Sequence, residues 1–457
     1  MKVLQVANGF PPASVVGVEQ YTHTLARALS QHHEVYVFCA ERTPDRREYA
    51  LINEEMDDLA VRRVVNNFRD VAGFEDLYVN PKIERLFEEY VDQVRPDLIH
   101  FQHCIGLSAT LPHLAARWGI PFVITLHDYW YICPTVKLLT NELTRCPGPH
   151  QGADCRQCFG PAFDIWTRLH RIPFYDTLWA RLVPRLLHRQ VLRLLKSSRR
   201  FTKPQTTGAP ETSRFTRRMQ AMQAVLGAAP WLLAPSRFVR DVYKAYGVPE
   251  DRISVLPLGL DTARWANQPE SADTPQVRFG YFGSLQAAKG IDFLVRAFVR
   301  LEGEQVELLV YGAGKPDEPF AERVRQTQDA RIRFLGRYDN SRLPELMARV
   351  DVVVIPSIWH ETFSIVAREA LLARLPVIAS AVGALPEVIV DNANGLLVPP
   401  SDEDALHQAM ARLVDDRYLL TRLKPSAAAV IDIHDHVNEL EHIYKDLKRT
   451  RTYVVPR

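Results

Sequence analysis

The sequence lacks several features that would place it outside the ordinary globular proteins. No uninterrupted apolar run reaches the roughly 18 residues that a membrane-spanning helix needs. No internal repeat or low-complexity tract is present, which argues against a repeat protein or a disordered chain. The first residues, MKVLQVANGFPP, have the pattern of a first strand and turn, not of a secretory leader.

Cysteine is scarce, and neither sign of charge dominates. Six cysteines in 457 residues do not form a disulfide framework, so we expect a reducing, cytoplasmic setting. The 56 Lys and Arg residues nearly balance the 54 Asp and Glu residues, so the whole molecule is not a general binder of polyanions. The 47% hydrophobic share is that of a soluble globular protein, and the length predicts two or three domains.

Short β-branched runs alternate with longer segments of helical periodicity, which is typical of βαβ units. Strands are expected at 2–7, 34–40, 98–103, 121–128, 231–236 and 253–261, and in a second series at 277–285, 306–314, 332–338, 350–357, 375–380 and 395–399. Periodicity lapses between the two series. We therefore predict two Rossmann-like, doubly wound α/β domains, residues 1–262 and 263–434, with a terminal helix, 435–457, that packs back on the first.

Glycines follow several of these strands, where doubly wound sheets bind their ligands. Gly17 precedes the first helix, Gly283 and Lys289 lie in FGSLQAAKG, and Gly312 with Gly314 forms the turn YGAG. Amides at such helix starts attract phosphate, and Lys289 could neutralise a diphosphate. Each residue also has a simpler explanation, as a glycine that serves backbone geometry or as a solvated lysine.

The segment PSIWHETFSIVAREALLARLPVIAS places Glu361 after an apolar strand and Glu369 inside a helix. The amides of 363–365 would form the helix start and favour a phosphate. Glu369 could accept hydrogen bonds from ribose hydroxyls, and Glu361 could hold sugar hydroxyls. Two alternatives stay open: the acids are surface charges, or they are a catalytic pair as in glycosidases.

Together these motifs resemble the family 4 retaining glycosyltransferases of the GT-B fold. The resemblance is carried by FPPASVVGVEQYTHTLARAL, TLHDYW, APSRFVRDVYKAYGV, VLPLGLD, FGSLQAAKG, LLVYGAG, FLGRYD, PSIWHETFSIVAREALLARLPVIAS, VGALPEVI and NGLLVPP. It covers nearly the whole chain except about 135 to 225. It implies two domains that face each other across a cleft, a first that binds the acceptor and a second that binds a nucleoside diphosphate sugar, with no catalytic metal.

The resemblance also implies a role for each matching residue. His127 and Glu361 would contact the transferred sugar, Lys289 would stabilise the leaving diphosphate, and Glu369 would bind the ribose. The remaining donor-binding positions would be Gly17, Gly283, Ser284, Gly312, Gly314, Phe363, Ser364 and Ile365. Two positions depart from the family pattern: Ser284 stands where an arginine is usual, and Val16 stands where a second glycine is usual. The expected histidines at the end of the 98–103 strand, His100 and His103, would line the cleft.

A cysteine-rich loop, 133–158, follows His127. Cys133, Cys146, Cys155 and Cys158 fall within it, the last two as a C-x2-C pair. Four thiolates at this spacing suit a structural zinc, and an iron–sulfur cluster is chemically possible. Free thiols or a single disulfide are the alternatives. By its position we expect this loop to shape the acceptor pocket.

The stretch 160–225 reads as a basic helical insertion in the first domain. Between 165 and 203 its arginines face few acids and are interleaved with aromatic residues. It is either a solvated face or a contact with an anionic membrane surface, which would make the protein peripheral at the inner face of the membrane. No nucleic-acid recognition motif accompanies the charge.

The sequence thus predicts a glycosyltransferase of polysaccharide biosynthesis that uses a UDP- or GDP-sugar. The acceptor would be a hydroxyl of a glycan, a lipid-linked saccharide or a small molecule. A nucleotide-sugar epimerase of the same fold class and a non-catalytic nucleotide-sugar-binding subunit are the alternatives, the latter because of Ser284.

Overall fold

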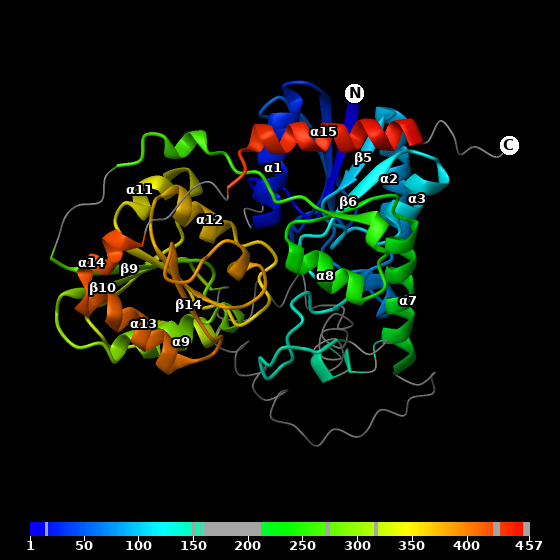
Figure 1. Ribbon diagram of the computed structural model, residues 1–457. Helices are drawn as coiled ribbons and strands as arrows, with labels where there is room; N and C mark the ends of the chain where they lie inside the picture. Colours follow the sequence, from blue (N-terminus) through cyan, green and yellow to red (C-terminus); the bar gives the residue numbers. More distant parts are fainter. Residues whose placement is uncertain are drawn as a thin grey trace, which may run out of the picture.

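The computed structural model describes residues 1–13, 17–148, 152, 154–155, 157–159, 212–269, 275–314, 319–423 and 430–450. Within these ranges the chain forms two α/β halves, each built around its own sheet (Figure 1). The predicted fold class, two Rossmann-like domains, is confirmed. The exact domain limits at 262/263 and 434/435 stay predictions.

The first half contains, in its described part, an eight-stranded sheet in the order β3-β4-β2-β1-β5-β6-β7-β8. The strands are β1 (Lys2–Ala7), β2 (Glu34–Glu41), β3 (Leu51–Met56), β4 (Leu59–Val65), β5 (Leu98–Phe101), β6 (Phe122–Thr125), β7 (Leu232–Ala234) and β8 (Ile253–Val255). The inner strands pair in parallel and are buried on both faces, which is why they read as apolar runs in the sequence. The edge hairpin β3–β4 is antiparallel, and neither of its strands was predicted from the sequence.

The second half contains, among its described residues, a six-stranded sheet in the order β11-β10-β9-β12-β13-β14. Its strands are β9 (Val277–Phe282), β10 (Val306–Tyr311), β11 (Ile332–Gly336), β12 (Val352–Ile355), β13 (Val377–Ser380) and β14 (Gly395–Val398). Every described pairing in this sheet is parallel. The carboxyl ends of these strands therefore share one edge, and the turns that carry the predicted donor-binding residues leave from it.

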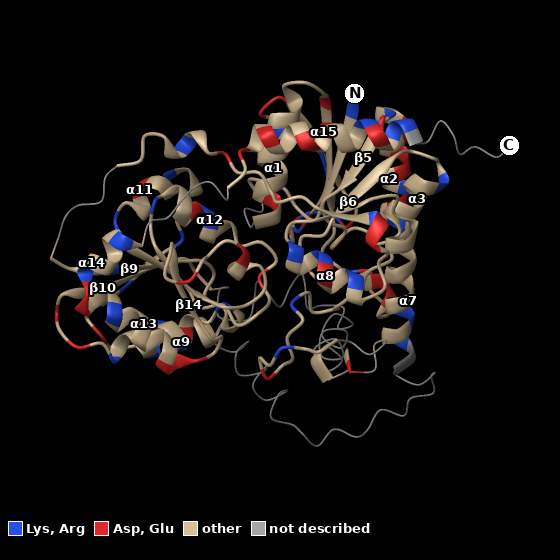
Figure 2. Ribbon diagram, in the orientation of Figure 1, with Lys and Arg blue, Asp and Glu red and all other residues tan. Residues whose placement is uncertain are grey.

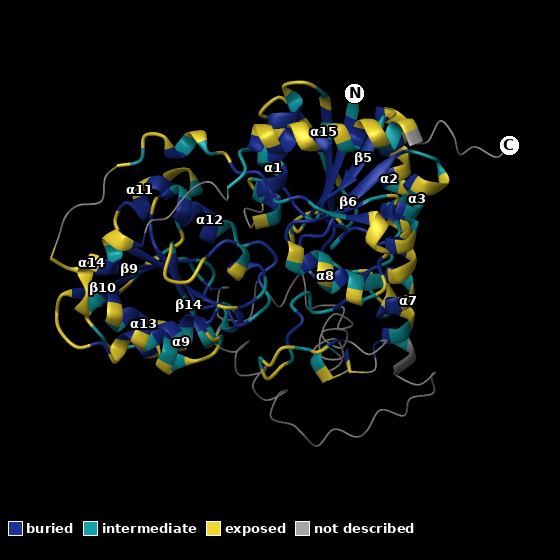
Figure 3. Ribbon diagram, in the orientation of Figure 1, coloured by how far each residue is buried: buried dark blue, intermediate teal, exposed yellow. Residues whose placement is uncertain are grey.

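Helices cover the faces of both sheets and turn their apolar sides inward (Figure 3). In the first half they are α1 (Gly17–Ser30), α2 (Pro81–Val94), α3 (Leu111–Arg117), α7 (Thr212–Ala228) and α8 (Arg237–Ala245). In the second they are α9 (Ile291–Val299), α10 (Pro319–Arg325), α11 (Leu343–Met347), α12 (Ile365–Leu372), α13 (Glu403–Asp415) and α14 (Arg417–Arg422). Local sequence fixes several of their starts: Asn80 caps α2 by accepting two amide hydrogen bonds, and proline occupies its first position.

The last described helix, α15 (Ile433–Thr450), lies across the first half and packs against α1 (Figure 1). Its fully buried Tyr444 hydroxyl lies 2.6 Å from Nδ1 of His100, on β5. Lys448 at its far end pairs with Asp97 at 2.9 Å. His100 therefore lies under α15, and its predicted place as a cleft-lining residue is wrong.

The chain crosses between the halves twice, and the two crossings are bonded to each other. The amide of Leu260 donates to the Ile431 carbonyl at 3.0 Å, and the amide of Ile433 donates to the Leu260 carbonyl at 2.8 Å. Thr262 and Asp432 add a side-chain hydrogen bond beside them. The first crossing leads from β8 to β9, and the second leads from α14 to α15.

Charges of both signs are interspersed over the described helices of both halves (Figure 2). The predicted basic membrane-contact stretch, 165–203, lies outside the described residues. Among the helices that the structure describes, none combines the length and apolar character required to cross a bilayer.

Candidate functional site

Glu361 lies in the loop between β12 and α12 and is the centre of a polar cluster. Its Oε1 atom accepts hydrogen bonds from the Lys289 ammonium at 2.7 Å, the Ser357 hydroxyl at 2.6 Å and the Trp359 indole N–H at 2.9 Å. Burial by itself raises the pKa of Glu361, but the Lys289 charge and these hydrogen bonds outweigh it, so the pKa lies below its ordinary value. The carboxylate is therefore ionised at neutral pH and paired with a cation.

Lys289 reaches this cluster because its backbone is held against the Glu361 loop. It ends the short 3-10 helix η5 (Ala287–Lys289), and Gly290 follows in the left-handed region at φ 69°. A Cβ atom on Gly290 would lie 1.8 Å from the Pro356 carbonyl oxygen, so only glycine permits this approach. The Lys289 ammonium also lies 4.9 Å from the centroid of the Trp359 ring, within range of a cation–π interaction.

A second glycine holds the backbone of Glu361 from the other side. Gly383 has φ 60°, and a Cβ atom there would lie 2.3 Å from the Glu361 carbonyl oxygen. The amide of the next residue, Ala384, donates to that same carbonyl at 2.7 Å. The position of the carboxylate is thus set by backbone contacts from two separate turns, after β9 and after β13.

Residues of the first half clamp the segment around Glu361. The Thr362 hydroxyl donates to the His127 carbonyl at 2.7 Å, and the Ser236 hydroxyl donates to the Thr362 carbonyl at 2.7 Å. The Tyr129 hydroxyl donates to the His360 carbonyl at 3.1 Å. Glu361 therefore lies where the two halves meet.

The starts of α1 and α12 lie side by side at this junction. A Cβ atom on Gly17, the first residue of α1, would lie 3.6 Å from the Cδ1 atom of Ile365, the first residue of α12. Ser364 precedes α12 in the left-handed region at φ 59°, and Arg368 donates to the carbonyls of Phe363 and Ser364. Two helix N-termini that meet in this way create a local positive potential suited to an anion.

Glu369 is buried one turn further along α12 and faces a different space. It lines a cavity of about 60 Å³ to which both halves contribute, with Tyr21 of α1 on one side and Arg264 and Asn340 on the other. Burial raises the pKa of Glu369 to about 7, against a smaller lowering by Arg264. Among the described residues no hydrogen bond holds its carboxylate, so its capacity to accept hydrogen bonds is unused.

His127 lies two residues after the end of β6, at the same junction, but its ring is engaged within the first half. Its Nε2 atom lies 2.7 Å from Gln102 Oε1, and its ring packs against Tyr21 with centroids 5.3 Å apart. Burial lowers the pKa of His127 to about 3, so the imidazole is neutral at physiological pH. Its predicted contact with a sugar stays a prediction.

The glycine turns after β9 and β10 pack closely on each other. Gly312 has φ 141°, and a Cβ atom on it would lie 1.7 Å from the Gly283 carbonyl oxygen. The carbonyl of Ser284 accepts a hydrogen bond from the Tyr281 hydroxyl at 2.7 Å. Gly314 stands two residues after Gly312 and is the last described residue before 319. These turns lie at the strand ends where the sequence placed them, and their donor-binding role stays a prediction.

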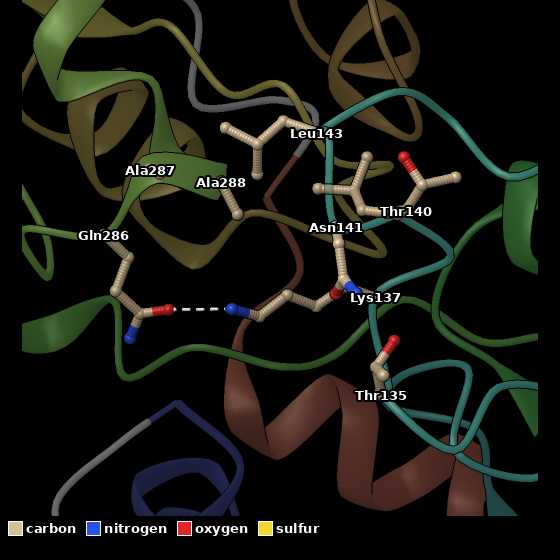
Figure 4. A pocket seen from close by; sticks show the side chains of 9 residues that line it. Thr135, Lys137, Thr140, Asn141, Leu143, Gln286, Ala287 and Ala288 are labelled. Carbon is tan, nitrogen blue, oxygen red and sulfur yellow. Dashed lines mark hydrogen bonds between the residues drawn. The ribbon is translucent and has the colours of Figure 1, made fainter. Parts of the chain in front are cut away.

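A larger pocket, of about 300 Å³, lies between the cysteine-rich loop and η5 (Figure 4). Lys137 of the loop crosses it and donates to Gln286 Oε1 at 2.9 Å. Neither residue was predicted from the sequence. The available signal was a single lysine in the run CPTVKLLTN, on a loop already expected to lie near the cleft.

The four predicted metal ligands are present as free thiols. Cys133 and Cys155 are buried, while Cys146 and Cys158 are half-buried. Burial raises the pKa of Cys155 to about 12, and the neighbouring thiols of Cys133, Cys146 and Cys158 act in the same direction. In the part of the chain that the structure describes, no group of three or more His, Cys, Asp or Glu side chains could hold a metal ion. The predicted zinc or iron–sulfur site therefore finds no support here.

Three residues of the Glu361 and Glu369 surroundings were also missed by the sequence analysis. Ser357 and Trp359 stand at alternate positions before Glu361, which is the spacing that directs side chains of an extended segment to one side. That alternation could have been used to predict that both side chains lie near Glu361. The sequence offers no comparable signal for Arg264, because it lies more than 100 residues from Glu369 in a segment without periodicity.

Comparison with known proteins gives two family matches that together cover most of the chain. The profile described as Glycosyltransferase Family 4 matches residues 15–264, and the profile described as Glycosyl transferases group 1 matches residues 276–416. A D-inositol 3-phosphate glycosyltransferase of Xylanimonas cellulosilytica is 34% identical over 229 residues, 45% of this chain and 54% of that protein. The matches span about half the length of the curated relatives.

Solved structures with the same fold cover nearly the whole chain. A sucrose-phosphate synthase from Thermosynechococcus elongatus superposes with a TM-score of 0.67 at 19% identity, over 98% of this chain and 99% of that one. HepE of Anabaena, solved in complex with UDP and glucose, gives 0.62 at 15% identity, over 97% and 99%. At these identities the similarity shows the fold.

Proposed function

This chain belongs to glycosyltransferase family 4, and we propose that it moves a hexose from a nucleoside diphosphate sugar to a hydroxyl group, with retention of anomeric configuration. One observation carries the proposal: Lys289 and Glu361, from two motifs 72 residues apart, form a 2.7 Å ion pair where the two halves meet. A cation for the diphosphate and a carboxylate for sugar hydroxyls are thereby held side by side.

In the proposed complex the donor lies along the junction of the two halves. Glu369 accepts hydrogen bonds from the ribose hydroxyls, and its unused acceptor capacity supports this role. The diphosphate lies at the adjoining helix starts of Gly17 and Ile365, near Lys289. The amides of Phe363 and Ser364, the turns at Gly283, Ser284, Gly312 and Gly314, and the side chains of His127 and Glu361 complete the donor site.

Transfer then requires positioning and charge stabilisation and no protein nucleophile. The acceptor oxygen bonds to the anomeric carbon while the bond from that carbon to the diphosphate oxygen breaks. The acceptor proton passes to the departing phosphate oxygen on the same face of the sugar. Lys289 and the two helix starts stabilise the charge that develops on the diphosphate, so we propose catalysis without a metal ion.

We propose UDP or GDP as the nucleotide and a glycan, a lipid-linked saccharide or a small molecule as the acceptor. The complex of HepE with UDP and glucose supports a uridine nucleotide, and the inositol phosphate relative supports a small acceptor. A cytoplasmic enzyme of polysaccharide biosynthesis, held at the inner face of the membrane through 165–203, would have access to lipid-linked acceptors. Salt-sensitive binding to anionic vesicles tests the membrane contact, and equal binding after four of those arginines are replaced would remove it.

A thermal-shift screen of UDP-, GDP- and ADP-sugars tests the donor site, because a ligand that binds the folded state raises its Tm by mass action. We expect one nucleotide class to raise the Tm of the wild type and to raise it less for Lys289→Met and Glu369→Gln. Nucleoside diphosphate release with an acceptor mixture then tests transfer, and NMR of the product reads the anomeric configuration. An epimer formed without acceptor would identify an epimerase. Donor binding without any release or transfer would identify a non-catalytic subunit.

A further inference from the structure

The turn that precedes α12 is held from the inside by a buried arginine. Arg368, the fourth residue of α12, is 5% exposed, and its Nη1 atom donates to the carbonyls of Phe363 and Ser364. Its guanidinium carbon lies 3.4 Å from the centroid of the Phe363 ring. Ser364 adopts the left-handed region at φ 59°, which residues with a side chain rarely do. Arg368 therefore stabilises an unusual turn with hydrogen bonds and a cation–π contact.

The same hydrogen bonds determine where the amides of this turn point. In a trans peptide unit the carbonyl and the N–H group point in opposite directions. Because the carbonyls of Phe363 and Ser364 face Arg368, the N–H groups of Ser364 and Ile365 face away from it. No described atom accepts a hydrogen bond from either N–H group. Ser364 and Ile365 are half-buried whereas Arg368 is buried, which places these two donors on the accessible side of the turn.

A cavity with an unused hydrogen-bond acceptor adjoins this turn. Ile365 lines the cavity of about 60 Å³ together with Glu369. Glu369 is 6% exposed, and no described group donates a hydrogen bond to its carboxylate. Two unused donors and one unused acceptor thus lie on the first two turns of a single helix. This arrangement suits a molecule that presents hydroxyl groups to the carboxylate and an anion to the N–H groups.

Arg368 also brings a positive charge that no neighbouring acid neutralises directly. Within the described part of the chain no carboxylate forms an ion pair with it, and its buried Nε atom has no hydrogen-bond partner. Burial lowers the pKa of Arg368 to about 9, against a smaller raising by Glu387. Glu387 is itself engaged with Arg237, 3.4 Å away. A buried cation without a partner is costly, and an anion bound at the turn would offset that cost.

Resting on the proposed function, we propose that Arg368 is a positioning residue for the donor diphosphate. It aims the N–H groups of Ser364 and Ile365 at the phosphates and adds a positive charge behind them, without touching the donor itself. The helix α12 then carries two separate recognition tasks. Glu369 recognises the nucleoside through its ribose, and Arg368 acts on the phosphates through the two amides. Loss of Arg368 should therefore weaken binding more, the more phosphates the ligand carries.

The test compares the Kd values of a nucleoside, its monophosphate and its diphosphate, measured by calorimetry with competition for the weaker ligands. The series is that of uridine, guanosine or adenosine, according to which diphosphate raises the Tm of the wild type. In Arg368→Met we expect the diphosphate Kd to rise about 30-fold, the monophosphate Kd to rise less, and the nucleoside Kd to stay within about twofold. Arg368→Lys keeps the charge without the planar fork and should show the same order with smaller losses. Arg422→Met, which removes an exposed arginine of α14, is the control for lost charge.

A merely structural role for Arg368 gives a different pattern. If its loss only loosened α12, Glu369 would be displaced too, and all three ligands would weaken by the same factor, as we expect for Glu369→Gln. Such parallel losses in Arg368→Met would overturn the inference, and so would an unchanged diphosphate Kd. Should Arg368→Met not fold, Arg368→Lys decides by the same two criteria. If no nucleotide raises the Tm of the wild type, the failure belongs to the proposed function instead.

Discussion

Replacing Glu369 with glutamine should stabilise the free protein and at the same time impair its function. Burial raises the pKa of this carboxyl from its ordinary 4.5 to about 7. Between these two values the unfolded chain loses the proton while the folded chain keeps it, so stability falls as the pH rises from about 4.5 to about 7. The difference of about 2.5 pH units, at about 1.4 kcal/mol each, is worth about 3 kcal/mol above pH 7.

Glu369→Gln removes this penalty because glutamine does not ionise. At pH 8 we expect a Tm several degrees above that of the wild type, at roughly 2–4 °C per kcal/mol for a domain of this size. At pH 4.5 the two proteins should melt together. Glu439→Gln, which replaces an exposed carboxylate of α15, is the control and should change neither value. A wild-type Tm that is flat between pH 5 and 8, or a variant no more stable than the wild type at pH 8, would refute the reasoning.

The same carboxylate predicts the pH dependence of donor binding. Two ribose hydroxyls can both donate to an ionised Glu369, whereas the protonated form has lost acceptor capacity. Donor affinity should therefore rise between about pH 6 and pH 8 in the wild type and stay flat in Glu369→Gln. Calorimetry in buffers of different ionisation enthalpy would detect the coupled proton release, and its absence would contradict the assignment.

Three further substitutions test other parts of the site. Lys289→Met should slow transfer at least about 100-fold and lower the Tm, because Glu361 is left buried without its cation; a rate within twofold of the wild type argues against the role. Gly383→Ala should destabilise the protein by more than Gly303→Ala, since both have a positive φ but only Gly383 has backbone within 3 Å of the added Cβ. Denaturant unfolding compares the two, and equal costs would refute the steric argument. Tyr444→Phe removes a buried hydroxyl and should cost about 1–3 kcal/mol in the same assay, while an unchanged midpoint would show that its hydrogen bond contributes nothing.

The elements that could be predicted from the sequence are those whose burial produces a simple pattern of apolar residues. Parallel strands such as β9 and β12 are buried on both faces, so they read as continuous apolar runs that end at a recognisable turn. The edge strand β3 was missed for the opposite reason. Its residues alternate between exposed and half-buried and three of its six side chains are polar, so LINEEM has no long apolar run to detect.

The candidate site divides in the same way. Residues at strand ends, such as Lys289 and Glu361, are placed by local strand and turn signals, and the family resemblance connects them. Contacts between segments that are distant in the sequence produce no such local signal. His100 is covered by a tyrosine 344 positions away, and Lys137 meets Gln286 across 149 positions. No periodicity or spacing encodes these pairings, because only the packing of the two halves creates them.

The paired crossings near Leu260 and Asp432 limit how the two halves can move. A single covalent connection would allow one body to swing and twist about its own backbone bonds in any direction. Two connections held together by hydrogen bonds remove the twisting component and leave rotation about one line through the junction. Substrate entry and product exit would then depend on a one-dimensional opening motion, whose axis lies far along the chain from the reacting groups and beside the start of α15.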